Sequence, residues 1–173
     1  MNNRRRDNDV VKLMMVYKVT LNYDKMSDLT VEFAGPRGSL YEGGLFKVHI
    51  EIPENYPYKS PSVGFETRVF HPNVDEASGS ICLDVLNETW SPMFDLKNIF
   101  EVFLPQLLMY PNPHHPLNGY AANLMINNPT QYQKKVKELV AKYSLLYEES
   151  ESNMSDDDVS EMSETSDLDQ DLL

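Results

Sequence analysis

The sequence predicts an α+β fold with an N-terminal helix, a four-stranded antiparallel meander, a long irregular loop and C-terminal helices. Two changes in the spacing of apolar residues carry this prediction. Apolar and polar residues alternate between about residues 17 and 66, which is typical of half-buried strands, whereas helical spacing precedes and follows this region. Short, turn-rich segments join the alternating runs, and strands joined in this way pair antiparallel.

The first helix and the strands follow from local patterns. Residues 4–16 carry an apolar face formed by Val10, Leu13 and Met14, which predicts a short amphipathic helix. Alternation then predicts strands over residues 17–22, 29–33, 46–52 and 62–66. Glycine and proline in the segments between them supply the turns.

Helical spacing returns after residue 95. Residues 96–110 carry leucines and aromatic residues at helical spacing, with Asp95 as a candidate N-cap, and Pro105 is expected to kink or shorten this helix. A weaker helix is expected over residues 116–127. A stronger one opens at Pro129 and runs through residue 146.

Residues 69–93 show no clean period, and His, Pro, Asn, Gly, Cys and Trp are concentrated there. A long irregular segment inside a compact domain is usually functional. The search for chemistry therefore starts in this loop.

The negative charge is concentrated at the C-terminal end. The chain carries a net charge of -12, yet residues 143–173 hold 11 acidic residues and no Lys or Arg, which leaves a nearly neutral body. We expect residues 1–147 to form one folded domain and residues 148–173 a disordered acidic tail. Such a tail cannot bury enough apolar surface to offset its ordering entropy.

The single cysteine excludes an internal disulfide and fits a reducing compartment. The early apolar stretch of residues 10–16 is interrupted by Lys12 and is too short to span a bilayer. A cytoplasmic location is expected, with nuclear access open, and neither a membrane nor a nucleic acid is expected as a partner. The run Arg4-Arg5-Arg6 is either a crude nuclear address or a solvated helix face.

Cys82 would, taken alone, be an inert small hydrophobe. Its neighbours change that interpretation, because His71-Pro72-Asn73 precedes it in the loop and Trp90-Ser91-Pro92 follows it. This arrangement resembles the active-site region of the ubiquitin-conjugating enzymes, where a His-Pro-Asn motif precedes the catalytic cysteine and a Trp-Ser-Pro motif follows.

The resemblance covers residues 10–147. Further landmarks lie in family order at residues 41–44, 56–61, 111–113 and 116–118. The resemblance implies the UBC-like fold, ubiquitin as the modifier, and the ubiquitin-activating enzyme, a RING-type ligase and protein substrates as partners. It implies no built-in cofactor, because the activating enzyme uses the ATP. Within the family the sequence most resembles the H-type enzymes, which share the acidic tail and an extra residue between Asn73 and Cys82.

The family chemistry implies that Cys82 holds ubiquitin as a thioester, since a thiolate is both a nucleophile and a leaving group. Asn73 is the candidate donor to the oxyanion of the transfer step, and one such donor is worth ~3 kcal/mol. Asn73 could equally pin the loop by bonding local backbone. His71, Pro72 and Trp90 are expected to be structural in this loop, with His71 locking it through hydrogen bonds.

The attacking lysine, with a reference pKa of ~10.4, must lose a proton first. Asp84, two residues after the cysteine, is one candidate acceptor. The family often carries an acid just before Pro116, but this sequence has His115 there, which puts a carboxylate-based account in doubt. A histidine can accept a proton near neutral pH. The neighbouring His114 is at least as well explained as a solvated cap.

The resemblance also implies a surface for the ligase and the activating enzyme that joins the first helix to two loops. Its candidate residues are Arg5, Arg6, Lys12, Tyr58, Pro92 and Met93. The acidic tail with interspersed Met and Leu is either a solubilising extension or a segment that docks on a ligase.

Three alternatives compete with conjugation. A cysteine hydrolase would need a base oriented onto the thiol, and no pattern marks one. A metal site is not expected, because the spacing of His71, Cys82, His114 and His115 matches no common zinc pattern. A non-catalytic ubiquitin-binding relative would usually lack the cysteine.

Overall fold

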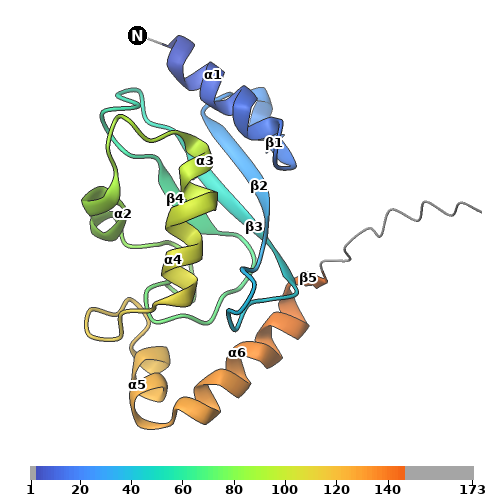
Figure 1. Ribbon diagram of the computed structural model, residues 1–173, viewed down its shortest axis with the longest axis vertical. Coiled ribbons are helices and arrows are strands. Elements are labelled where there is room, and N and C mark those ends of the chain that lie inside the picture. The colour runs from blue at the N-terminus through green and yellow to red at the C-terminus, as the bar shows by residue number, and fades with distance from the viewer. Residues whose placement is uncertain (1–2, 147–173) are drawn as a thin grey trace, which may run out of the picture.

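The structure is a computed structural model and describes residues 3–146 (Figure 1). Strands β1 (Val19–Leu21), β2 (Asp28–Ala34), β3 (Gly44–Glu51) and β4 (Ser62–Phe65) form an antiparallel sheet in the order β1-β2-β3-β4. The predicted α+β fold and its meander are therefore confirmed. A short strand that was not predicted, β5 (Leu145–Leu146), pairs with the start of β3.

The sheet buries one face because its strands alternate. In β3 the side chains of Phe46, Val48 and Ile50 are buried, and Leu29, Val31 and Phe33 of β2 are buried beside them. The helical segment of residues 96–109 packs on this face and contributes Leu96, Ile99, Phe100 and Leu104 to the same core (Figure 1).

That segment consists of α3 (Leu96–Asn98), a π-helical stretch, η2 (Ile99–Phe103), and α4 (Leu104–Met109). Asp95 caps it, because its carboxylate accepts from the Asn98 N–H while the Asn98 side chain accepts from the Asp95 N–H. Pro105 does not end the helix. The wider π turn just before it accommodates a residue that lacks an N–H and whose ring crowds the preceding turn.

The region predicted as wholly irregular contains a helix, α2 (Leu83–Thr89), so that part of the prediction is wrong. Only Leu86 is fully buried on this helix, because most of its seven residues face solvent. A helix of two turns with one buried side chain leaves no periodic signal in the sequence.

The remaining helices lie at the two ends of the sheet. Helix α1 (Asn3–Met14) lies at one end, and α5 (Gly119–Asn127) and α6 (Pro129–Tyr143) lie at the other (Figure 1). Helix α5 begins three residues later than the predicted residue 116, because Asn118 caps it by accepting from the Ala121 N–H. Helix α6 begins at Pro129 as predicted but ends at Tyr143, before β5.

The predicted acidic tail, residues 148–173, lies outside the described residues. Within residues 3–146 the chain forms no helix that is both long and apolar enough to cross a membrane.

Candidate active site

Cys82 lies at the end of an irregular strand that the sheet holds in place. The N–H of Phe65 donates to the Gly79 carbonyl at 2.8 Å, and the N–H of Ile81 donates to the Val63 carbonyl at 3.3 Å. Ile81 also forms a bridge with Val74. Cys82 follows directly, at the start of α2, with a free and partly exposed thiol.

A turn of residues 75–79 precedes this strand. Two hydrogen bonds from Ser78, from its side chain and its N–H, lower the pKa of the Asp75 carboxyl. Gly79 has φ +73°, and a Cβ there would lie 1.8 Å from the Phe65 carbonyl oxygen. Only glycine therefore fits this turn without moving the strand that leads to Cys82.

His71 is buried and uses both ring nitrogens. Its Nε2 donates to the Leu107 carbonyl at 2.8 Å, and its Nδ1 accepts from the Asn73 N–H at 2.9 Å. This pattern requires the neutral ring. Burial lowers the pKa of His71 to about 4, despite the bond to Leu107. The imidazole therefore ties the loop to α4 and has no free nitrogen for proton transfer.

Asn73 is also buried, and its amide connects two segments. Its Nδ2 donates to the Asn112 carbonyl at 2.8 Å and to the His115 carbonyl at 3.3 Å, and its Oδ1 accepts from the Asn112 N–H at 2.7 Å. Both N–H groups of the amide are therefore occupied by the loop of residues 112–115. This geometry pins that loop against the residues before Cys82.

Pro72 and Trp90 also fix the segments around Cys82 by hydrogen bonds. The Pro72 carbonyl accepts from the N–H groups of Leu117 and Asn118 at 2.9 and 3.0 Å. The Trp90 Nε1 donates to the Pro57 carbonyl at 2.8 Å, so the indole is fixed against the neighbouring loop.

The two candidates for lysine activation are both exposed. Asp84 lies in the first turn of α2, and His115 lies in the loop held by Asn73. Within the described part of the chain, neither side chain has a hydrogen bond or an ion pair. Both are free to meet an incoming amine.

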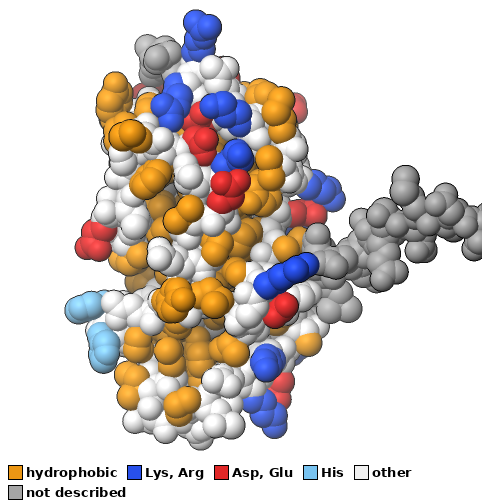
Figure 2. Space-filling view, viewed as in Figure 1, with side chains coloured by type: hydrophobic (Ala, Val, Ile, Leu, Met, Phe, Trp, Pro, Cys, Tyr) orange, Lys and Arg blue, Asp and Glu red, His pale blue; other side chains and the backbone are white. Residues whose placement is uncertain are grey.

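The candidate partner surface separates into two groups. Tyr58 and Met93 are 82% and 91% exposed, and Pro92 is also exposed, so these loop residues are accessible. On α1, where charged side chains of both signs gather (Figure 2), Lys12 is exposed and Arg6 pairs with Asp7.

Arg5, on α1, is half-buried and bonds within the protein. Its Nε donates to Asp9 Oδ2 at 2.6 Å and its Nη2 donates to the Phe94 carbonyl at 2.9 Å. The sequence pattern did not single out Asp9. An acidic residue beside Val10, on the apolar face of a predicted helix, was nevertheless a signal of a buried carboxylate.

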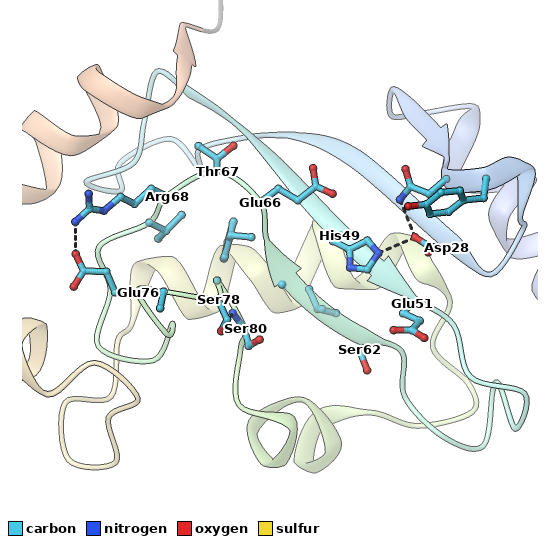
Figure 3. A pocket seen from close by; sticks show the side chains of 18 of the residues that line it. Asp28, His49, Glu51, Ser62, Glu66, Thr67, Arg68, Glu76, Ser78 and Ser80 are labelled. Atoms are coloured by element: carbon cyan, nitrogen blue, oxygen red, sulfur yellow. Dashed lines mark hydrogen bonds and ion pairs between the residues drawn. The ribbon is translucent and has the colours of Figure 1, made fainter.

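One large groove of the described chain is not lined by Cys82. It has a volume of about 1050 Å³ and lies on the outer face of the sheet, where Asp28, His49, Glu66, Arg68 and Glu76 line it (Figure 3). His49 Nε2 lies 2.7 Å from Asp28 Oδ1, and bonds from Asn22 and then His49 lower the pKa of Asp28. The Cys82 thiol is partly exposed outside this groove.

Residues 5–140 match the family model of the ubiquitin-conjugating enzymes. The chain belongs to the ubiquitin-conjugating enzyme family. It is 56% identical over 167 residues to ubiquitin-conjugating enzyme E2 5 of Arabidopsis thaliana, and this match covers 96% of this chain and 90% of that relative. It is 51% identical over 142 residues to ubiquitin-conjugating enzyme E2-24 kDa of Saccharomyces cerevisiae, covering 82% of this chain and 65% of the yeast protein.

Solved structures agree with this assignment. The E2 domain of a Toxoplasma gondii ubiquitin conjugating enzyme superimposes with a TM-score of 0.76 at 27% identity, covering 84% of this chain and all of that one. The predicted UBC-like fold is confirmed. Like its family, this ubiquitin-conjugating enzyme is a transferase with a thioester intermediate, and its partners are ubiquitin, the activating enzyme and ubiquitin ligases.

Proposed function

We propose that Cys82 is the residue on which this enzyme carries ubiquitin. The supporting observation is that the single cysteine of the chain is partly exposed at the end of a strand fixed by the sheet. Its sulfur attacks the thioester carbonyl of ubiquitin on the activating enzyme, a new C–S bond forms and the other thiol leaves. A lysine amine then attacks, loses a proton and expels the Cys82 thiolate, which leaves an isopeptide bond.

Asn73 is proposed to support this chemistry both by positioning the loop and by donating to the oxyanion. Its amide holds the loop of residues 112–115, and the 3.3 Å bond to the His115 carbonyl is the longer of the two that its Nδ2 donates. Releasing that bond would free one N–H for the oxyanion while the bond to Asn112 keeps the loop in place. Asn73 would then first hold the loop with both N–H groups and afterwards donate one of them to the oxyanion.

His115 and Asp84 are the proposed proton acceptors for the incoming lysine. His115 is favoured, because Asn73 fixes its backbone while its ring stays exposed. Asp84 is the second candidate and lies in the first turn of α2, directly after Cys82. A carboxylate there would also attract the ammonium form of a lysine.

A RING-type ligase and the activating enzyme are proposed to bind the surface formed by α1, Tyr58 and Pro92-Met93. Exposed aromatic and Met side chains on fixed loops suit interface anchors. The acidic tail is proposed to dock on the ligase, in a cytoplasmic or nuclear setting. Deleting residues 148–173 should then weaken ligase binding several-fold, and unchanged affinity would sink the docking proposal.

The test of the proposed function is a charging reaction with ubiquitin-activating enzyme, ubiquitin and ATP, followed on reducing and non-reducing gels. We expect a one-ubiquitin adduct that a thiol reductant removes. Cys82→Ala should give no adduct while retaining the wild-type melting temperature. A wild-type protein that is folded yet forms no reductant-sensitive adduct would contradict the assignment.

A further inference from the structure

A carboxylate is buried on the inner side of α1. Asp9 is 1% exposed, and its Oδ2 accepts from both the Arg5 Nε at 2.6 Å and the Tyr56 hydroxyl at 2.7 Å. Its other oxygen has no hydrogen-bond partner within the described chain and lies 3.8 Å from the Lys12 Nζ. A buried charge is costly unless it is paired, so the two donors on Oδ2 stabilise it.

The donor Tyr56 belongs to the loop that carries Tyr58. Tyr56 is buried, its ring lies 5.8 Å from that of Trp90, and burial together with the bond to Asp9 raises the pKa of its hydroxyl well above the usual range. Tyr58 lies two residues further on and is exposed. The bond to Asp9 therefore fixes the base of this loop against α1.

The donor Arg5 also bonds the loop that carries Met93. The Nη2 of Arg5 donates to the carbonyls of Phe94 at 2.9 Å and Pro92 at 3.3 Å, on either side of the exposed Met93. The guanidinium presents several donors in a fixed plane, so it can bond Asp9 and these carbonyls together. One carboxylate oxygen thus joins α1 to both loops.

We infer that Asp9 is a positioning residue for partner binding, which fixes the spacing between Tyr58 and Met93 through Tyr56 and Arg5. The inference rests on the proposed partner surface. Two anchors that are held in place lose less conformational entropy when a partner binds, so preset spacing strengthens binding without a direct contact. Arg5 is thereby assigned to holding a loop and not to meeting a partner.

Hydrogen exchange tests the positioning without any partner. Asp9→Asn should accelerate amide exchange at least about threefold in both loops, residues 55–59 and 91–95, while β2 and β3 exchange as in the wild type. Asp7→Asn is the matched control, because it removes the same charge from an exposed site on the same helix and should leave both loops unchanged. Wild-type exchange in both loops of Asp9→Asn would overturn the inference.

Charging kinetics with purified ubiquitin-activating enzyme test the consequence. Asp9→Asn should raise the KM for this protein about five- to tenfold and leave kcat within about twofold, since the positioning affects binding and not chemistry. Adding Tyr56→Phe to Asp9→Asn should change KM little further, because both act through one oxygen. A fall in kcat together with faster exchange in β2 and β3 would indicate general unfolding and contradict the inference.

Two surface variants separate this inference from the proposed surface. Tyr58→Ala and Met93→Ala should each raise KM with the fold intact. If both leave KM unchanged, the proposed surface itself is wrong. If both raise KM and Asp9→Asn does not, the surface stands and the positioning role of Asp9 is wrong.

Discussion

The side-chain amide of Asn73 pairs with the backbone of Asn112 as one peptide group pairs with another, donating to its carbonyl at 2.8 Å and accepting from its N–H at 2.7 Å. The two residues are 39 positions apart in the chain. This pair holds the loop that carries His115 against Asn73, and the neighbouring Val74 bridges Ile81, the residue before Cys82. A change at Asn73 should therefore affect both stability and chemistry.

Asn73→Ala should lower the free energy of unfolding by about 1–3 kcal/mol, because it leaves the Asn112 backbone groups without partners. It should also slow discharge of the thioester to free lysine by about 10²- to 10³-fold, through loss of the oxyanion donor. Thermal unfolding and single-turnover discharge measure the two effects. Discharge at the wild-type rate would reduce Asn73 to a structural residue.

His71 should make stability depend on pH. Its pKa is lowered to about 4 in the folded protein, so the unfolded chain binds more protons between that value and the ordinary pKa of ~6.5. Stability should therefore fall as pH falls through this window, by about 3 kcal/mol in total, and the contribution should stay constant below it.

The measurement is denaturant unfolding at several pH values for the wild type and His71→Gln. The glutamine amide can donate to the Leu107 carbonyl but does not titrate, so the difference in slope isolates His71 from the carboxylates. Equal slopes for the two proteins would show that His71 does not titrate as described.

Gly79→Ala should distort the strand before Cys82, because its Cβ would meet the Phe65 carbonyl at 1.8 Å. We expect a loss of about 2–4 kcal/mol in stability and slower charging. Gly38→Ala is the matched control, since Gly38 also has a positive φ but nothing lies near its Cβ position. Its cost should be only about 1 kcal/mol. Equal losses would mean that conformational strain, and not the clash, sets the effect.

His115→Ala should slow discharge to free lysine at neutral pH about 10-fold or more while charging is unchanged, because a proton acceptor is lost. His115→Asp should recover most of the rate, since a carboxylate can take the same role. If His115→Ala discharges normally, the acceptor is elsewhere, and Asp84→Asn becomes the variant that must slow the reaction.

The sequence predicted the sheet well because Phe46, Val48 and Ile50 face one core at strand spacing, and such a signal is local. It did not predict α2, where only Leu86 is fully buried. The motifs indicated which loop carries the cysteine. A sequence motif does not show which distant residues its members bond in the fold.

The roles that the sequence left open depend on contacts between distant segments. The partners of Asn73 lie 39 and 42 residues away, so its amide could be assigned either of two roles until these contacts were known. Arg5 and Asp9 have the spacing of an ordinary helical ion pair, and the place of Asp9 on the apolar face is the one local sign that it is buried. Its other partner, Tyr56, is 47 residues away, so the sequence does not reveal this contact.

The most direct test of the central claim is to trap ubiquitin on residue 82 with Cys82→Ser and to map the adduct by mass spectrometry. A serine forms an oxygen ester that a thiol reductant does not cleave, so the account predicts a one-ubiquitin adduct on residue 82 that survives reductant and is released by mild alkali. An adduct found only on lysines, with residue 82 unmodified in a folded and assay-competent protein, would contradict it.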